Sequence, residues 1–164
     1  MSAQAPLTVW VGLAEQRLLL RRGARVLMDV AVSTAANGGG EVIDSLCTPR
    51  GWHVIRAKIG SGAPANTVFA GRRPTGELFV PAMRAAAPGR DWILTRILWL
   101  SGLERGRNRL GAVDTMRRYV YIHGAPDDVP MGVPGSHGCV RMRNADVIRL
   151  FDAVVPGTRV LIED

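Results

Sequence analysis

The stretch Ser136-His137-Gly138-Cys139-Val140-Arg141 places a cysteine directly after a glycine, with a histidine and an arginine two residues to either side. A cysteine nucleophile requires a base that takes its proton, a group that orients this base, and hydrogen-bond donors for the oxyanion. Gly138 lets the backbone approach a substrate carbonyl closely, and we expect the N–H groups of Gly138 and Cys139 to point at the developing oxyanion. The stretch therefore indicates a cysteine nucleophile at residue 139.

His123 is the candidate base for this thiol. It lies at the end of a predicted strand, and the loop over residues 125–135, rich in Pro, Gly and Asp, can bring it close to Cys139. Gly124 offers a backbone carbonyl that can fix the tautomer of the imidazole through its other nitrogen. Free cysteines are more often small buried hydrophobes, but a Gly-flanked loop with two nearby histidines is an unusual place for one.

These residues resemble the signature of the L,D-transpeptidase catalytic domain of the YkuD type. In that signature a histidine precedes, across a loop, the sequence Ser/Thr-His-Gly-Cys and an arginine two places on. The resemblance covers about residues 7–163, because Val32-Ser33-Thr34 and the turn Thr48-Pro49-Arg50-Gly51 are similar to the strand-loop-turn entry of the family. It implies a flattened, β-sandwich-like domain with mixed sheets.

The resemblance also implies a function for the stretch. Substrates of the family are peptidoglycan stem tetrapeptides or muropeptides, and the expected intermediate is an acyl-enzyme on Cys139 formed as the terminal D-Ala leaves. We expect no cofactor and no metal, and we expect carbapenem-type inhibitors to acylate the cysteine. The implied catalytic residues are Cys139, His123, Gly124 and His137, and the implied substrate or oxyanion residues are Ser136, Gly138 and Arg141. His137 could instead only shape the turn, and Arg141 could pair backbone carbonyls under the loop.

The acceptor of the acyl group divides the family. An amine from a neighbouring stem gives a 3–3 cross-link, whereas water gives a tripeptide and makes the enzyme an L,D-carboxypeptidase. Residues 1–6 lack the basic and apolar regions of a signal peptide, and no apolar run is long enough to span a membrane. We therefore expect a cytoplasmic enzyme of murein recycling that uses water, or a periplasmic one if the chain has been trimmed. A transpeptidase is the alternative.

Other classes of function remain open at this stage. His123, His137 and Cys139 could ligate zinc with His53 or an acidic residue, although paired ligands such as C-x₂-C are missing. The net charge of +7 could mark a nucleic-acid-binding module, although aromatic residues make up only 5% and no such motif is present. An inactive scaffold is a third possibility. We assign His53 and Cys47 to the structure, and we expect neither nucleic acid nor membrane as a partner.

Outside this stretch the sequence predicts one mainly β domain over residues 7–163, preceded by a short tail over residues 1–6. With 164 residues, 47% of them hydrophobic, the chain can form a single core without a metal or disulfide. Asn144 is a predicted helix N-cap, Val147, Leu150, Phe151 and Val154 share one helical face, and Gly157 is the predicted C′ glycine. Strands are predicted over residues 7–11, 17–20, 25–33, 52–59, 119–122 and 158–162.

In the middle of the chain the apolar residues follow neither the helical nor the strand period. Residues 67–70 and 78–80 could be short strands, residues 91–100 could be a buried helix or strand, and residues 101–109 are predicted as a loop. We expect residues 68–109 to form a structured insertion that covers one end of a sheet.

Overall fold

The computed structural model describes residues 3–164. Ten strands form one mixed sheet in the order β3-β2-β1-β10-β4-β7-β5-β6, with β8 paired to β7 and β9 paired to β8. The elements are β1 (Leu7–Gly12), β2 (Arg17–Arg22), β3 (Arg25–Ala31), β4 (Gly51–Ile59), β5 (Thr67–Ala70), β6 (Arg73–Leu78), α1 (Pro81–Ala86), β7 (Ile93–Gly102), β8 (Tyr121–Ala125), β9 (Val140–Arg143), α2 (Asn144–Ala153) and β10 (Arg159–Glu163), with a 3₁₀ turn over Gly111–Val113.

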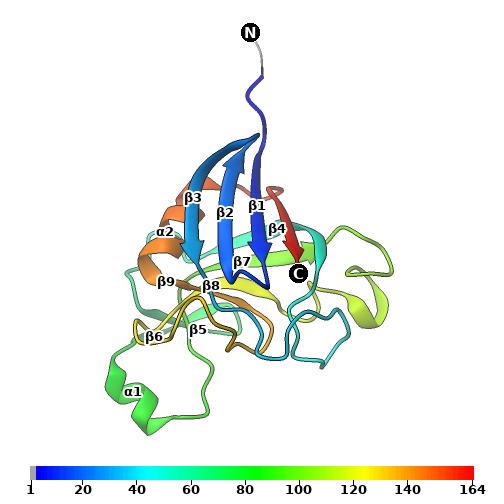
Figure 1. The fold of residues 1–164 in the computed structure, drawn as a ribbon. Helices are drawn as coiled ribbons and strands as arrows, with labels where there is room; N and C mark the ends of the chain where they lie inside the picture. Colours follow the sequence, from blue (N-terminus) through cyan, green and yellow to red (C-terminus); the bar gives the residue numbers. More distant parts are fainter. Residues whose placement is uncertain (1–2) are drawn as a thin grey trace.

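The sheet is strongly curled. β1, β2 and β3 run across the direction of β7 and β8, and α2 packs against the sheet (Figure 1). α2 contacts β7, β8 and β9, so the helix lies directly over the pair of strands that carries the candidate site residues. The prediction of a mainly β single domain with one α-helix in its C-terminal half is confirmed, and the strands all belong to one continuous sheet.

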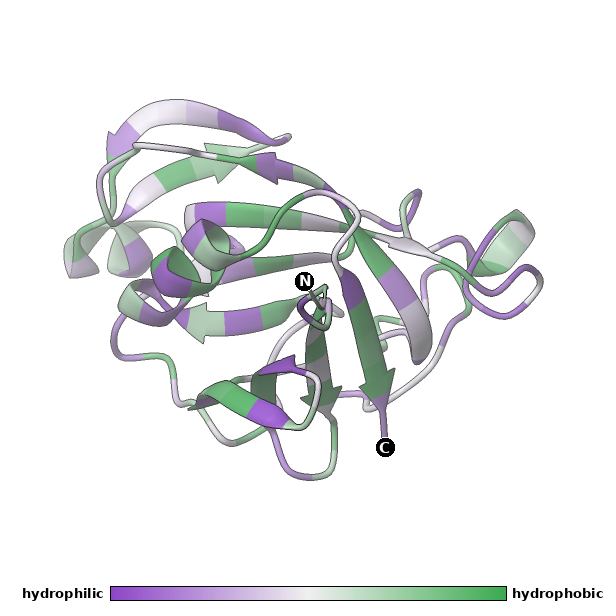
Figure 2. Cartoon of the chain, turned by 90° about the horizontal axis from the view of Figure 1, so that it is seen from above, coloured by the Kyte–Doolittle hydropathy of each residue, from purple (hydrophilic) through white to green (hydrophobic). Residues whose placement is uncertain are grey.

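Burial alternates along the first strands. Val9 and Val11 of β1 and Leu18 and Leu20 of β2 are buried, whereas Trp10 and Leu19 between them are less so, as expected for a strand with one face on the core. Figure 2 shows the apolar residues concentrated in the strands of the sheet. β2 and β3 pair in antiparallel fashion on either side of the turn at Gly23, so they form a hairpin.

Residues 68–109 do not form an insertion that covers one end of the sheet. They are structured, but β7 within them is a central strand that pairs with β4, β5 and β8. β7 is buried over most of its length, because sheet neighbours flank it on both edges and α2 covers it. A strand buried in this way shows no period of two. β7 also includes Ser101 and Gly102, which were predicted as loop.

Several predicted boundaries were wrong. β6 ends at Leu78, so residues 79–80 are not a strand, and the helix α1 that follows them was not expected. Arg143, not Asn144, is the N-cap of α2, because the Asn144 side chain bonds to Thr95, Asn66 and Asp127 instead. Gly157 has a φ of +94° but lies beyond the C-cap Val154 in the turn before β10, so it is not the C′ residue.

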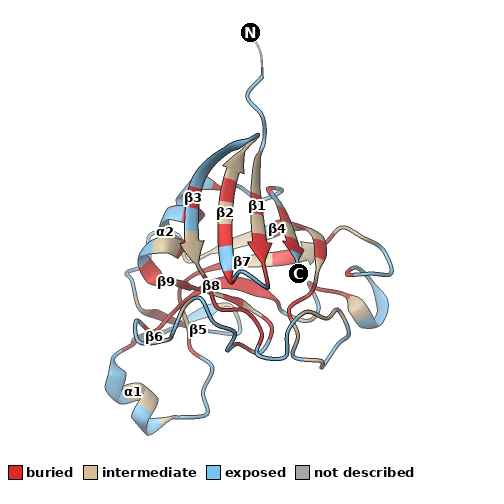
Figure 3. Ribbon diagram, viewed as in Figure 1, coloured by how far each residue is buried: buried red, intermediate tan, exposed pale blue. Residues whose placement is uncertain are grey.

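The main core lies between α2 and the sheet. Its buried side chains come from every strand except β5 and β6 and from α2, and they include Leu98, Ile122, Val140 and Leu150. Figure 3 shows this buried centre, whereas α1 projects from the body with no buried residue. Residues 3–6 of the predicted tail are exposed, and residues 1–2 lie outside the described residues. No helix within residues 3–164 has both the length and the apolar character needed to cross a membrane.

Candidate active site

The parallel pair β8–β9 places Cys139 beside the strand that carries His123. In this pair Ile122 is opposite Val140 and His123 is opposite Arg141. Side chains two apart on a strand share a face, so Tyr121 and His123 project toward the same side as Cys139 and Arg141. All four line one cavity of about 360 Å³, together with Ser136 and His137. The fold thus brings together the residues that the sequence separates by the loop over residues 125–135.

His123 is fully buried, and its tautomer is fixed by one hydrogen bond. The Nδ1–H group donates to the Gly124 carbonyl at 2.6 Å, so in the neutral ring Nε2 carries the free lone pair. Nε2 has no hydrogen-bond partner among residues 3–164. Burial lowers the pKa of His123 below its usual value, against the opposing effects of Asp91 and of the Gly124 carbonyl. The imidazole is therefore an uncharged base at neutral pH.

Gly124 has no room for a side chain. A Cβ atom here would lie 2.4 Å from Asn144 Oδ1 and 2.7 Å from the Leu94 carbonyl oxygen. β8 consequently lies close against β7 and the first residue of α2. This close packing holds the Gly124 carbonyl at the distance at which it orients the ring of His123.

Cys139 is a half-buried free thiol directly before β9. Its Sγ accepts a hydrogen bond from the Tyr121 N–H at 3.3 Å, and its S–H points to the Tyr119 carbonyl at 3.6 Å. Burial raises the pKa of the thiol to about 12; Asp91 adds to this, and the Tyr121 N–H group opposes it. The cysteine and histidine are thus both uncharged, and they are not hydrogen-bonded to each other. To pass its proton to Nε2 of His123, the S–H group must leave the Tyr119 carbonyl.

The turn before Cys139 is held by hydrogen bonds of its own. Ser136 Oγ donates to the Cys139 carbonyl at 2.6 Å and accepts the Gly138 N–H at 3.2 Å. Thr48 Oγ1 donates to the Gly138 carbonyl at 2.9 Å, and the φ of Gly138 is +131°. The Gly138 N–H is therefore already bonded within the turn, which differs from the oxyanion role expected for it. The contacts of Ser136 serve to shape the loop that presents the thiol.

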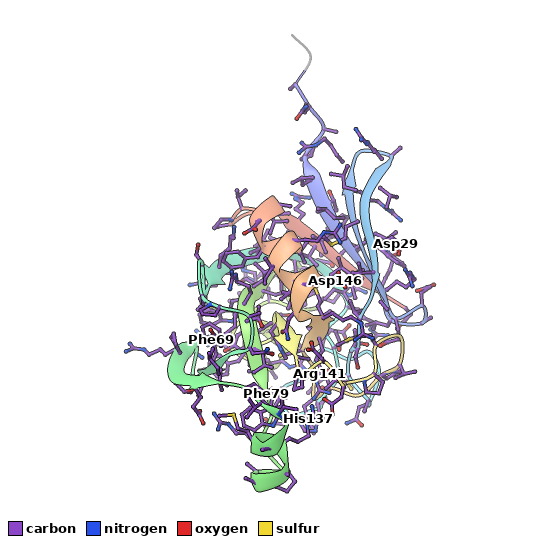
Figure 4. All side chains as sticks on the ribbon, turned by 90° about the vertical axis from the view of Figure 1, so that its left-hand side faces the viewer. Asp29, Phe69, Phe79, His137, Arg141 and Asp146 are labelled. Carbon is purple, nitrogen blue, oxygen red and sulfur yellow. The ribbon has the colours of Figure 1, made fainter. Side chains whose placement is uncertain are left out.

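His137 and Arg141 occupy different parts of the rim. His137 is exposed and also lines a neighbouring recess of about 300 Å³ with Ile43, Leu46 and Tyr119. Arg141 donates through Nη1 to the Gly135 carbonyl at 3.2 Å, and its Nη2 lies 3.5 Å from Asp91 Oδ1. Arg141 therefore supports the loop, which is one of the two roles expected for it. It also faces the cavity. Figure 4 shows both side chains at the same end of the molecule, away from Asp29.

Sequence reasoning missed several residues of the cavity wall, among them Asp91, Arg118, Tyr119 and Tyr121. Tyr121 had a signal, because it lies two residues before His123 on the same strand. Asp91 had none, because the pairing of β7 with β8 brings it to the site from a distant part of the chain. Arg118 donates to the carbonyl oxygens of Gly40, Glu41 and Cys47, so its guanidinium holds the loop that supports Gly138.

The residues of the zinc alternative do not form a metal-binding cluster, although His123, His137 and Cys139 line one cavity. No cluster of three His, Cys, Asp or Glu side chains suited to a metal ion occurs in the part of the chain that the structure describes. His53 is fully buried between the Gly51 carbonyl and Thr115 Oγ1, each 3.0 Å from a ring nitrogen. It does not line the cavity at Cys139, and burial lowers its pKa to about 4.

Comparison with known proteins points to one family. The sequence model of the L,D-transpeptidase catalytic domain, YkuD, matches residues 6–162. Over 47 residues the chain is 47% identical to an Escherichia coli protein named "Probable L,D-transpeptidase YbiS". That alignment covers 29% of this chain and 15% of YbiS, so it compares only a small part of the relative.

Solved structures show the same fold. An L,D-transpeptidase from Mycobacterium smegmatis matches with a TM-score of 0.63 and 18% identity, over 98% of this chain and 59% of that one. L,D-transpeptidase 3 from Mycobacterium tuberculosis, solved with a faropenem-derived adduct, matches with a TM-score of 0.58 and 14% identity, over 99% of this chain and 62% of that one. The chain spans about three-fifths of these proteins, and at such identities the likeness concerns the fold.

Proposed function

The chain belongs to the family of L,D-transpeptidase catalytic domains, and from that premise we propose that it is a cysteine acyl-transferase acting on peptidoglycan stem tetrapeptides. The observation that carries the proposal is the partnerless Nε2 of His123 in the same cavity as the Cys139 thiol. A buried base with a free lone pair beside a nucleophile matches the requirement of covalent catalysis. Such geometry often tightens only once substrate is bound.

The first half-reaction forms a thioester. Cys139 Sγ attacks the carbonyl that follows the L-centre of the third residue, and the S–H proton passes to His123 Nε2. The imidazolium then returns this proton to the departing nitrogen of D-Ala as the C–N bond breaks. Because the thiol pKa is high and the imidazole pKa is low, a preformed ion pair is disfavoured and proton transfer accompanies the attack.

The second half-reaction releases the acyl group. A water molecule attacks the thioester carbonyl, His123 Nε2 takes its proton, and the Cys139 sulfur leaves and is reprotonated. Water needs no binding site of its own, and Cys139 is half-exposed in the cavity. We therefore favour hydrolysis to the tripeptide, an L,D-carboxypeptidase activity that fits murein recycling.

An amine acceptor is the second candidate. The recess lined by Ile43, Leu46 and Tyr119 adjoins the cavity at His137 and offers space of about 300 Å³ beside the thiol. A neighbouring stem peptide seated there could present its amine to the thioester, and the product would be a 3–3 cross-link. The two candidates share the first half-reaction and differ only in the acceptor.

β-Lactams of the carbapenem type are expected to acylate the same thiol. A solved L,D-transpeptidase, LdtMt1, is in complex with imipenem, a carbapenem. We expect that incubation of this protein with a carbapenem adds the mass of one inhibitor to Cys139 and none to Cys47, the other cysteine of the chain.

Product analysis tests the proposed reaction. The protein is incubated with disaccharide tetrapeptide, and loss of D-Ala is followed by mass spectrometry. Cys139→Ala should lower the rate by a factor on the order of 10³ or more, whereas the matched control Cys47→Ala should leave it within about twofold of the unmodified protein, as for a thiol outside the machinery. Undiminished activity of Cys139→Ala would overturn the acyl-enzyme, and cross-linked dimers in excess of tripeptide would overturn water as the acceptor.

A further inference from the structure

The strand β7 contains a bulge directly opposite His123 and Gly124 of β8. Gly124 is paired with Leu94, whereas His123, the residue before it, is paired with Ile97. One step along β8 therefore corresponds to three steps along β7, and residues 95–96 are the two extra residues. Bulges are frequent next to active sites, where they redirect a side chain or interrupt strand pairing.

Thr95, the first residue of this bulge, has a strained backbone. Its φ is +74°, in the left-handed region where the Cβ atom of an L-residue is crowded by its own backbone. It is the only β-branched residue with a positive φ within residues 3–164, and its side chain is fully buried. Such a conformation persists only where the surrounding structure holds it, and strained residues are concentrated at functional sites.

The hydroxyl group of Thr95 joins the bulge to the start of α2. Its Oγ1 donates to Asn144 Oδ1 at 2.6 Å and accepts the Asn66 N–H at 3.0 Å. Asn144 Nδ2 donates in turn to Asn66 Oδ1 at 3.0 Å and to Asp127 Oδ1 at 3.4 Å. A hydroxyl has a single proton to donate, so these bonds fix the bulge and the side chain of Asn144 relative to each other.

Both ends of the bond between Thr95 and Asn144 press against Gly124. A Cβ atom built at Gly124 would lie 2.4 Å from Asn144 Oδ1 and 3.1 Å from Thr95 Cβ. The Gly124 carbonyl is the group that accepts the Nδ1–H of His123 at 2.6 Å. A shift of the bulge therefore moves the carbonyl that determines the tautomer of His123.

Arg96, the second residue of the bulge, is also unfavourable for folding. Its Nη1 donates to the carbonyl oxygens of Thr95 and Ala63, each at 2.7 Å. The side chain is buried, and its Nε has no hydrogen-bond partner in the part of the chain that the structure describes. Burial of a cation that has only carbonyl partners is costly. Two unfavourable features thus occur together at the step of the sheet next to His123, which favours a functional reason for the bulge.

We propose that Thr95 is a positioning residue for the base of the reaction. Its hydroxyl holds the bulge and Asn144 against Gly124, so that the Gly124 carbonyl stays on the Nδ1–H of His123 and Nε2 keeps its lone pair. Without this support the imidazole exchanges between two tautomers, and the form protonated at Nε2 cannot accept the proton of Cys139. The inference rests on the proposed function for the role of His123, and it adds a residue that does not line the cavity.

Thr95→Val tests the hydroxyl, because valine has the same shape and neither donates nor accepts a hydrogen bond. The tautomer of His123 is read at pH 7.5 from the ¹⁵N chemical shifts of its ring, with His53→Gln and His137→Gln used to assign the signals. The unmodified protein should show the Nδ1–H tautomer alone, and Thr95→Val should show a mixture. The kcat for release of D-Ala should fall by about 10²-fold, as for a misplaced catalytic group, while KM changes by less than about twofold.

Two further variants separate positioning from general stability. Thr95→Ser keeps the hydroxyl and should restore the single tautomer and most of kcat. Thr115→Val is the matched control, because the Thr115 hydroxyl is equally buried and bonds to the ring of His53, the other buried histidine. Thr115→Val should lower the midpoint of urea unfolding, as Thr95→Val does, but it should leave the tautomer of His123 and kcat unchanged.

Thr95→Gly keeps the inference testable if Thr95→Val does not fold. Glycine adopts a φ of +74° without strain, so relief of strain offsets the lost hydroxyl, and the variant should fold, show both tautomers and have a lower kcat. If folded variants without the hydroxyl keep the Nδ1–H tautomer, Thr95 has no positioning role, whatever happens to kcat. A mixture of tautomers with full kcat would overturn the inference as well.

The tautomer is measured without substrate, so this inference and the proposed function fail separately. If the unmodified protein releases no D-Ala but loss of the Thr95 hydroxyl still mixes the tautomers of His123, the proposed function is wrong and Thr95 still holds the ring. If the unmodified protein releases D-Ala but the tautomer does not respond to Thr95→Val or Thr95→Gly, the function stands and the positioning role is wrong.

Discussion

At the scale of single residues, Cys139 and His123 are both held in their uncharged forms. Burial acts on the two groups in opposite directions, because it raises the pKa of a thiol and lowers that of an imidazole. The Tyr121 N–H group that bonds to Sγ favours the thiolate but does not outweigh burial. Without substrate the site therefore holds a neutral thiol and a neutral imidazole, rather than a thiolate–imidazolium ion pair. This has a measurable consequence for the thiol.

Alkylation of Cys139 should report its raised pKa. In a Cys47→Ser background, we expect the rate of reaction with iodoacetamide to rise with pH and to show no plateau near pH 9, because the thiolate fraction keeps growing toward a pKa of about 12. The rate is measured from pH 5 to 10 by mass spectrometry of the labelled protein. A rate that is high and constant between pH 5 and 8 would instead reveal a thiolate–imidazolium pair and contradict the expectation.

At the scale of elements, the site depends on how closely β8 approaches β7 and α2. Gly124→Ala should destabilise the protein by about 1–3 kcal/mol, the usual cost of forcing a methyl group into a packed interior, since its Cβ would meet the Leu94 carbonyl at 2.7 Å. Urea unfolding measures the change. The displaced strand should also shift the carbonyl that orients His123 and lower kcat.

Gly89 provides the matched control for this substitution. Nothing lies within 4 Å of a Cβ built at Gly89, so Gly89→Ala should change the free energy of unfolding by no more than about 0.5 kcal/mol. Equal effects of the two substitutions would show that the tight contact at Gly124 is relieved by small movements, and that β8 is not fixed as described.

The elements also show what could be predicted from the sequence. β1, β2 and β4 were predicted within a few residues, because each is a short run rich in apolar residues next to a turn. β7 could not be assigned because it is buried over most of its length, so its apolar residues show no strand period. α1 could not be predicted because it has no buried residue, so its sequence shows no apolar face. Asn144 looked like an N-cap, but its partner Thr95 is 49 residues away, and such tertiary contacts leave no local signal.

Some residues of the candidate site could likewise be predicted from the sequence, and others could not. His123, Ser136, His137, Cys139 and Arg141 could be singled out because their chemistry is concentrated in two short segments. Asp91 could not, because only the antiparallel pairing of β7 with β8 brings the start of β7 to the cavity. The bond between Gly138 N–H and Ser136 Oγ depends on the exact conformation of the turn, which residue types alone do not determine.

At the scale of the whole molecule, two buried histidines flank the central strand. His53 on β4 is opposite Gly102 near one end of β7, and His123 on β8 is opposite Ile97. Both are fully buried, and burial lowers both pKa values. The unfolded chain takes up protons at these residues near pH 6.5, whereas the folded chain does not until the pH is lower. Acidification therefore favours unfolding of the entire sheet.

The sign and size of this effect can be tested with His53. Its contribution is fully present above pH 6.5 and is lost as the pH falls toward its folded pKa of about 4, which amounts to about 2 kcal/mol between pH 7.5 and pH 5. Urea unfolding of His53→Gln at both pH values should show a pH dependence smaller by that amount than the unmodified protein. His137→Gln, which alters the exposed histidine, should keep the full dependence. If His53→Gln keeps it as well, the unfolded and folded chains bind protons at residue 53 alike, and burial of this imidazole in its neutral form is ruled out as a source of acid sensitivity.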